Sequence, residues 1–279
     1  MRSVIDNMKQ SIYGSTGFIG KRYSELYQQN IVSQDRTQRK PITDDIVYFI
    51  STVHNYNVFD NITLDVNTNL NVLCEVLDNC RDRDITFNFI SSWFVYGKTE
   101  LPANEEMYCF PKGFYSITKK AAEDLLISFC ETYHKNYRII RLCNVLGRGD
   151  EKVSSSKNAL TYMIECLKRN EDVYLYDEGT PKRDVMHLDD VCNAINLICN
   201  KGNLNEIYNV GSGYPTEISA IINLAKQFLG SNSKIKYKEA SEFYQIVQTK
   251  DFWMDNSKLK RLGFEQTISL EKIVEELCQ

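Results

Sequence analysis

Gly14-Ser-Thr-Gly17-Phe-Ile-Gly20 is the stretch of sequence that decides the fold. It follows a short strand-like run at Ser11–Tyr13 and opens helical spacing over Phe18–Gln29. Glycines at this spacing permit a tight turn and close backbone approach to a pyrophosphate, and a helix N-terminus offers free N–H groups to the phosphates. The order strand, glycine turn, helix predicts a dinucleotide site, with a merely structural turn as the alternative. The residues predicted to bind the dinucleotide here are Gly14, Thr16, Gly17, Phe18, Ile19 and Gly20.

The residues after this loop continue to alternate between strand-like and helical patterns. Strands are expected at Asn30–Ser33, Ile46–Ile50, Ile85–Ile90 and Tyr137–Val145, and helices at Leu64–Leu77 and Tyr115–Tyr133. This alternation predicts an α/β fold, a doubly wound parallel sheet of Rossmann type with helices on both faces. Only Arg36–Asp45 separate the second and third strands, which is too short for a crossover helix. One strand–helix unit at the adenine end is therefore expected to be missing or reduced.

The pattern changes after Gly147, where short strands (Val173–Tyr176, Ile207–Val210, Lys234–Tyr237) mix with helices. We expect a smaller mixed α/β C-terminal lobe that binds the substrate. The predicted boundaries are residues 1–147 for the dinucleotide-binding domain, with 184–213 returning to it, and residues 148–183 and 214–279 for the substrate lobe.

Composition narrows the class of protein further. The chain has 279 residues, of which 43% are hydrophobic and 25% charged, so it can form a sizeable core. Its net charge of −4 argues against a nucleic-acid partner, which calls for a strongly basic surface. No apolar run approaches the roughly 18 residues of a membrane span, and the polar start lacks a secretory signal. We therefore expect a cytoplasmic protein without a membrane partner.

Cysteine and histidine usage gives no sign of a metal centre. The nine cysteines contain no Cys-x-x-Cys pair, and the three histidines do not cluster in the sequence. The cysteines are expected to be buried, reduced thiols rather than disulfides or metal ligands.

Charged residues at the end of the second predicted strand bear on the choice of cofactor. Asp35 lies 15 residues after Gly20, where an acid binds the adenosine ribose and favours NAD. Arg36, Arg39 and Lys40 follow at once and could instead hold a 2′-phosphate, or form a solvated basic loop. The sequence therefore predicts NAD or NADP and leaves the choice open.

A tyrosine and a lysine one helical turn apart indicate proton chemistry. Tyr115 and Lys119 share one face of the predicted helix, and a nearby cation lowers the pKa of a phenol. Such a tyrosine can serve as acid and base in an alcohol–ketone interconversion. Ser92 follows the Ile85–Ile90 strand, and the carboxyl ends of parallel strands form the ligand crevice. Its hydroxyl can hold the substrate oxygen, although a polar strand-end cap is the alternative.

Five motifs in order resemble the extended short-chain dehydrogenase/reductase family, the NAD-dependent epimerase/dehydratase group that acts on nucleotide sugars. They are the glycine loop, Ser91-Ser-x-x-Val-Tyr-Gly97, Tyr115 with Lys119, Arg141-x-x-Asn144-Val-x-Gly147, and the run from Gly179 through Arg183-Asp-x-x-His187 to Asp190. Asn209-Val-Gly-Ser-Gly213 extends the resemblance over nearly the whole chain.

The resemblance implies a role for each matching residue. Ser92 orients the sugar oxygen, Tyr115 is the acid/base, and Lys119 lowers its pKa and binds the nicotinamide ribose. Asn144 and Arg183 hold the substrate diphosphate, for which a guanidinium fork is well suited. Ser51, after the third strand, is assigned to the cofactor site.

Two departures from the family pattern bear on the type of reaction and on phosphate binding. Trp93 and Phe94 stand where dehydratases carry acidic residues, which makes 4,6-dehydration improbable. Gln248 and Lys250 stand where a second phosphate-binding arginine is usual. We predict an NAD(P)-dependent nucleotide-sugar epimerase that transfers hydride at C4.

Other functions stay open at this point. An NAD(P)H-dependent 4-keto-sugar nucleotide reductase is the close alternative, and a nucleotide-binding protein without catalysis is a third. The helix at Tyr115–Tyr133 is apolar on more than one face, which is typical of a helix buried on two sides, and we expect a homodimer. The resemblance implies that two such helices form the dimer interface.

Overall fold

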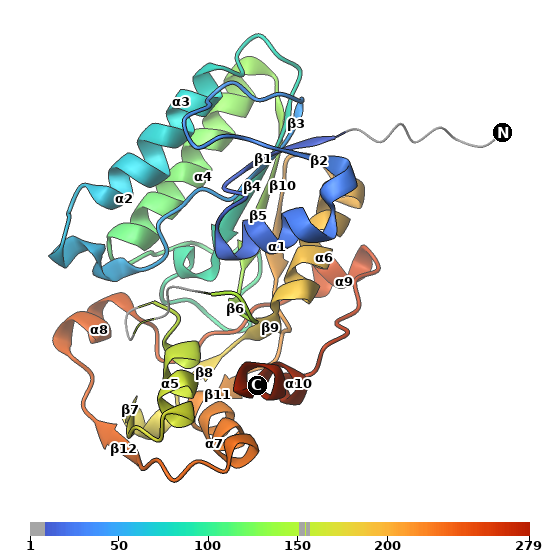
Figure 1. Ribbon diagram of the computed structural model, residues 1–279. Coiled ribbons are helices and arrows are strands. Elements are labelled where there is room, and N and C mark those ends of the chain that lie inside the picture. The colour runs from blue at the N-terminus through green and yellow to red at the C-terminus, as the bar shows by residue number, and fades with distance from the viewer. Residues whose placement is uncertain (1–8, 151–153, 155–156) are drawn as a thin grey trace.

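A six-stranded parallel sheet forms the centre of the computed structural model, which describes residues 9–150, 154 and 157–279 (Figure 1). The polar start of the chain thus lies mostly outside the described residues. Across the sheet the strands run β2 (Ile31–Ser33), β1 (Gln10–Tyr13), β3 (Asp45–Tyr48), β4 (Thr86–Ser92), β5 (Asn136–Leu142) and β10 (Glu206–Val210). All five neighbouring pairs are parallel. The predicted doubly wound α/β fold is confirmed.

Helices cover both faces of the sheet (Figure 1). One face carries α1 (Phe18–Leu26) and α6 (Leu188–Lys201), and the other carries α2 (Leu64–Val66), the π-helical turn η3 (Asn67–Asn71), α3 (Val72–Asp78) and α4 (Phe114–Tyr133). The position of β3 in the middle of the sheet explains why its sequence is continuously apolar. Val47 packs toward α1 and α6, while Ile46 and Tyr48 pack with α3 and α4, so both faces of the strand are buried.

The connection at residues 36–45 contains neither a helix nor a strand before Asp45. Strand β2 is therefore the edge of the sheet, and the reduction expected at this end is confirmed. Several predicted boundaries are wrong in detail, and strand β3, for example, ends at Tyr48 rather than Ile50. Helix α1 ends at Leu26 rather than Gln29, and the strand expected at Tyr137–Val145 breaks at Cys143. It breaks because Asn144 pairs with β9 (Val185–His187) instead of continuing along β4.

The C-terminal lobe has a separate apolar core. It is built from α5 (Ala159–Lys168), β7 (Val173–Tyr176), α7 (Ile218–Leu229), β12 (Ile235–Lys238) and α10 (Leu270–Cys278). The chain does not stay in this lobe after residue 214, because Phe252, Met254 and Leu259 pack in the core beside α1 and α6. The exact domain boundaries remain a prediction.

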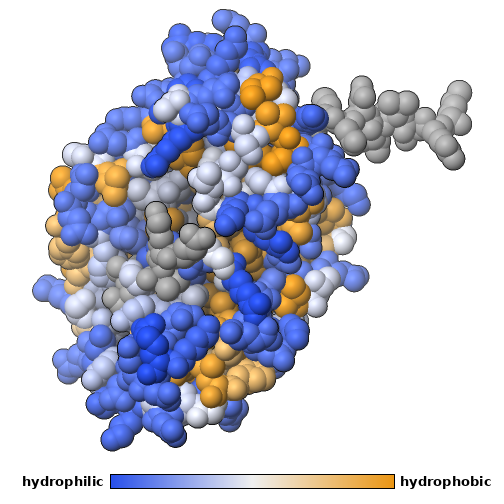
Figure 2. Space-filling model, viewed as in Figure 1, coloured by the Kyte–Doolittle hydropathy of each residue, from blue (hydrophilic) through white to orange (hydrophobic). Residues whose placement is uncertain are grey.

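Figure 2 shows that one face of the molecule is largely hydrophilic, with hydrophobic residues in small separate patches. Within the described ranges, no helix combines the length and apolar character that a membrane crossing requires.

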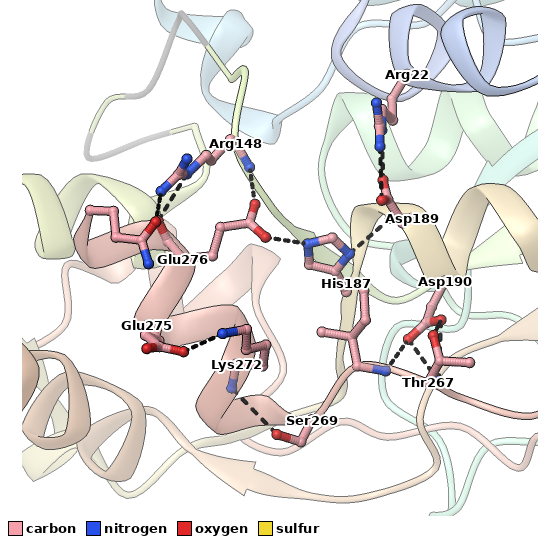
Figure 3. A network of polar contacts seen from close by, with 12 residues as sticks. Arg22, Arg148, His187, Asp189, Asp190, Thr267, Ser269, Lys272, Glu275 and Glu276 are labelled. Carbon is pink, nitrogen blue, oxygen red and sulfur yellow. Dashed lines mark hydrogen bonds and ion pairs between the residues drawn. The ribbon is translucent and has the colours of Figure 1, made fainter.

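The His187 motif joins the C-terminal helix to the sheet domain (Figure 3). His187 Nδ1 accepts a hydrogen bond from the Asp189 backbone at 3.0 Å and caps α6, while its Nε2 lies 3.1 Å from Glu276 on α10. Asp189 in turn receives the Arg22 guanidinium of α1 at 2.6 Å, which lowers the pKa of the Asp189 carboxyl. Asp190 accepts a hydrogen bond from the Thr267 hydroxyl at 2.7 Å. These contacts hold α10 against the N-terminus of α6.

A buried ion pair fixes α4 to the sheet. The Arg141 guanidinium on β5 donates to Glu123 on α4 at 2.7 and 3.1 Å, and their side chains are only 2% and 1% exposed. The Ser91 hydroxyl donates to the same carboxylate at 2.5 Å, and the guanidinium lies 4.6 Å from the Tyr96 ring centre. Burial opposes the charge of Arg141, but Glu123 outweighs it and raises the pKa of the guanidinium.

We expect Arg141→Met to lower the free energy of unfolding by about 3–5 kcal/mol, because it leaves the Glu123 carboxylate buried without a counter-charge. Urea unfolding followed by circular dichroism measures the loss. The matched control is Lys120→Met, which removes the ion pair with Asp124 on the exposed side of the same helix and should cost less than about 1 kcal/mol. Equal losses in the two variants would contradict a special contribution from the buried pair.

Candidate active site

The glycine loop joins β1 to α1 at the point where the order of the strands reverses, because β2 lies on one side of β1 and β3 on the other. Gly14 has φ +84°, a conformation that favours glycine. A Cβ on Gly20 would lie 2.2 Å from the Gly14 carbonyl oxygen, so α1 can approach the loop only with glycine there. These two glycines are required by the protein's own packing.

Gly17 differs from its neighbours. A Cβ there would meet the Gly14 carbonyl oxygen at 3.5 Å, an ordinary contact, and its φ of −78° suits any residue. The fold itself therefore does not demand glycine at this position. Gly17 is also the N-cap of α1 and has no side-chain cap, so the helix N-terminus is bare. A bare helix N-terminus at a sheet switch point fits a dinucleotide pyrophosphate.

The residues predicted to bind the adenosine ribose lie in the loop after β2. Asp35 is exposed, and its carboxylate accepts hydrogen bonds from the Thr37 hydroxyl at 2.6 Å and the Thr37 backbone at 2.9 Å, which lower its pKa. Arg39 forms an ion pair with Glu75 and donates to the Arg36 carbonyl oxygen at 2.8 Å. Asp35 and Arg39 thus help to order this loop.

Tyr115 lies in the first turn of α4, beside the ends of β3 and β4. Its side chain is buried, and burial raises the pKa of the phenol. Hydrogen bonding with Ser92 and with Ser51 acts in the opposite direction, while the negative charge of Asp65 raises the pKa further. The structure thus brings together Tyr115, Ser92 and Ser51, three residues that the sequence analysis assigned to the site.

Lys119 follows one turn later and is also buried. Its Nζ donates to the Ile90 carbonyl oxygen at 2.7 Å and lies 4.1 Å from the centre of the Phe89 ring. Burial lowers the pKa of Lys119 to about 7, although Glu123 opposes the change. Near neutral pH the side chain is therefore present both as ammonium and as amine. Its predicted roles toward Tyr115 and the nicotinamide ribose stay predictions.

Aromatic rings connect the acid/base candidate to the candidate phosphate site. Phe94 meets Tyr115 edge-on at 5.8 Å between ring centres and stacks on Trp93 at 4.0 Å. Trp93 stacks on Phe252 at 4.7 Å and has the Arg183 guanidinium 5.6 Å from its ring centre. The two residues that replace the acidic pair of dehydratases thus form an apolar wall.

Arg183 lies on β8 (Lys182–Arg183) and is 5% exposed. It donates to the Lys250 carbonyl oxygen at 2.6 Å and to the Thr249 carbonyl oxygen at 3.1 Å. Burial lowers its pKa, and the ion pairs among the described residues include none to Arg183. A buried guanidinium that donates to neutral carbonyl oxygens and has no carboxylate partner among the described residues fits an anionic ligand. The Asn144 amide donates to the Asp184 carbonyl oxygen at 3.1 Å, next to Arg183 in the chain.

The sequence analysis missed the polar residues behind Tyr115. Asp65 and Asn69 are 1% and 2% exposed and lie on the inner side of the α2–α3 segment, in line with the buried Leu73. The Asn69 amide donates to Thr118 on α4 at 2.9 Å. The signal was available, because these two polar residues occupy positions at helical spacing within the apolar stripe.

The chain belongs to the NAD dependent epimerase/dehydratase family, whose model matches residues 35–211. The resemblance inferred from the motifs is confirmed, and the protein is a member of a family of NAD-dependent enzymes that act on nucleotide sugars. The glycine loop precedes the matched range, so its role in cofactor binding stays a prediction, which the geometry above supports.

Named relatives agree with this assignment. The chain is 25% identical to the low-salt glycan biosynthesis protein Agl12 of Haloferax volcanii, over 97% of this chain and 90% of the relative. It is also 25% identical to a putative UDP-glucose 4-epimerase of Methanocaldococcus jannaschii, over 81% of this chain and 73% of the relative. The structure of UDP-glucose 4-epimerase from Thermotoga maritima with UDP-glucose superposes with a TM-score of 0.86 at 21% identity, over 97% of both chains. At that identity the superposition shows a shared fold.

Proposed function

We propose that this protein is a nucleotide-sugar epimerase in which Tyr115 transfers the proton at the reacting sugar oxygen. The observation that carries the proposal is the position of Tyr115 beside Ser92 and Ser51, at the carboxyl ends of two parallel strands. A phenol next to a serine hydroxyl can share one substrate oxygen with it, which places a proton donor and a positioning group on the same atom.

The chain's own residues divide the work of epimerisation. Ser92 holds the sugar oxygen, and Tyr115 accepts the hydroxyl proton when that carbon becomes a ketone. After the keto sugar turns over, Tyr115 returns the proton to the oxygen on the other face. NAD, when bound, supplies the reversible two-electron oxidation. The bare N-terminus of α1 at Gly17 would hold its pyrophosphate, and Lys119 its nicotinamide ribose.

The same proposal assigns the substrate diphosphate to Arg183 and Asn144. Arg183 supports this because its guanidinium is buried without a carboxylate partner among the described residues. The Trp93–Phe94 wall lies between Arg183 and Tyr115, so a sugar that joins them lies along apolar rings. Carboxylate chemistry at that wall is not available, which argues against 4,6-dehydration.

Tyr115→Phe should abolish turnover and leave nucleotide-sugar binding intact, because the substitution removes only the phenol oxygen. Wild type is first screened with UDP-glucose, dTDP-glucose and a GDP-sugar, and the active one is then used for rates and for binding by calorimetry. The matched control is Tyr108→Phe, since Tyr108 also precedes a lysine by four residues but is 80% exposed. Turnover that persists in Tyr115→Phe would contradict this mechanism.

A 4-keto-sugar nucleotide reductase is the second candidate, and the raised pKa of Tyr115 favours it because a reductase needs only the proton-donating form. Mass spectrometry of the nucleotide released on denaturation separates the two. An epimerase recycles its cofactor in place, so stoichiometric NAD is expected. A protein that is empty and then binds NADPH would instead support the reductase. A protein that binds neither would remove the redox proposal.

Helix α4 supports the proposed homodimer in part. Leu126 packs in the core, but Ile117 and Leu125 are 50% and 41% exposed on the outer side of the helix. Light scattering at micromolar concentration should therefore give twice the monomer mass. Ile117→Glu should halve that mass, whereas Ile246→Glu, at another exposed apolar position, should leave it unchanged. Monomeric wild type would exclude the interface.

A further inference from the structure

Thr249 carries a buried hydroxyl that the proposed function does not use. It lies in the irregular segment just after α8 (Glu242–Val247). The Thr249 Oγ1 atom is buried and has no hydrogen-bond partner among the described residues. A hydroxyl can both donate and accept a hydrogen bond, and burying one without a partner is unfavourable. The presence of such a group therefore calls for an explanation.

The backbone of Thr249 contacts Arg183, the candidate ligand of the substrate diphosphate. The Nη2 group of Arg183 donates to the Thr249 carbonyl oxygen at 3.1 Å. Its Nη1 group donates to the carbonyl oxygens of Lys182 at 2.8 Å and Lys250 at 2.6 Å. Both hydrogens of Nη1 are thus used, while Nη2 keeps one. N–H groups of the guanidinium therefore remain for Tyr244, which also interacts with it, and for a ligand.

Contacts with β8 fix the segment that contains Thr249. The Asp251 carboxylate accepts from the Lys182 backbone at 2.9 Å, and the Phe252 backbone donates to the Lys182 carbonyl oxygen at 3.0 Å. Phe252 then stacks on Trp93 at 4.7 Å between ring centres. One short segment thus lies against both the candidate phosphate site and the apolar wall along which we place the sugar.

A diphosphate carries several acceptor oxygens, and Arg183 can bond only some of them. A hydroxyl that donates to an anionic phosphate oxygen forms a short, charge-assisted hydrogen bond. The polar neighbours of Thr249 are less enclosed, since Lys250 is exposed and Gln248 is partly exposed. Thr249 is therefore the residue of this stretch that has a buried, unused donor next to the guanidinium.

We propose that the Thr249 hydroxyl donates a hydrogen bond to the substrate diphosphate, next to the guanidinium of Arg183. A phosphate oxygen supplies the partner that the hydroxyl lacks. The inference rests on the proposed function, in which Arg183 binds that diphosphate, and it adds a neutral donor to the charged one. Thr249 is then a binding residue, whose loss weakens affinity and leaves the proton transfer by Tyr115 unchanged.

Calorimetry with nucleoside diphosphates tests the inference without turnover. UDP, dTDP, GDP, CDP and ADP are screened on the wild type, and the one that binds most tightly is used for the variants. Thr249→Val removes the hydroxyl and keeps the shape of the side chain. We expect it to weaken binding about tenfold, the effect of losing a hydrogen bond to a charged group. Thr249→Ser keeps the hydroxyl and should bind like the wild type.

A merely structural role of Thr249 predicts a different pattern. Replacing an unpartnered buried hydroxyl by a methyl group does not lower stability, so Thr249→Val should keep its Tm while it loses affinity. The matched control is Tyr48→Phe, which removes another buried hydroxyl without a described partner and should leave the affinity unchanged. If Thr249→Val does not fold, Thr249→Ala compared with Thr249→Ser isolates the hydroxyl in the same way.

Unchanged affinity in Thr249→Val would overturn the inference. Equal losses in Thr249→Val and Thr249→Ser would also overturn it, because the hydroxyl would then make no difference. Arg183→Gln separates these results from failure of the proposed function. If only Arg183→Gln weakens binding, the diphosphate site stands and Thr249 is not part of it. If the wild type binds none of these nucleotides, the inference and the proposed function both fall.

Discussion

The buried Glu123–Arg141 pair is the interaction on which the site depends. Tyr115, Lys119 and Glu123 follow one another at four-residue steps along α4, so they share one stripe of the helix. Arg141 holds the last of them to β5, and the Ile90 carbonyl oxygen holds the second to β4. With two points of the stripe fixed to the sheet, the rotation of α4 is set, and Tyr115 must face the ends of β3 and β4.

The charged side chains buried along α4 differ in their partners. The buried Glu123 carboxylate is engaged by Arg141 and Ser91. Lys119 has a carbonyl and an aromatic face instead of a carboxylate, and its pKa falls to about 7. Lys119 and Tyr115 are thus both biased toward their neutral forms.

The C-terminal lobe reaches the sheet through side chains of one motif. Arg183 meets the carbonyls of Thr249 and Lys250, Asp184 accepts from Ser212, and His187 faces α10. In the structure, the motif from Arg183 to His187 therefore mainly connects the C-terminal lobe to the sheet domain. Arg183 is the member of the motif whose buried charge lacks an anion, which is why we assign it to the ligand.

From the sequence alone we could predict the parallel sheet, the glycine loop, the missing unit at residues 36–45, and the placement of Tyr115 and Lys119 one turn apart on one helix. These follow from local periodicity, turn chemistry and spacing, which act over a few residues. The tertiary structure was needed to show that the strand expected at Tyr137–Val145 breaks at Cys143, and that residues 252–259 return to the first core. It was also needed to show that Asp65 and Asn69 are buried. Such facts depend on contacts between segments far apart in the chain, where burial and the competition for hydrogen-bond partners override local preference.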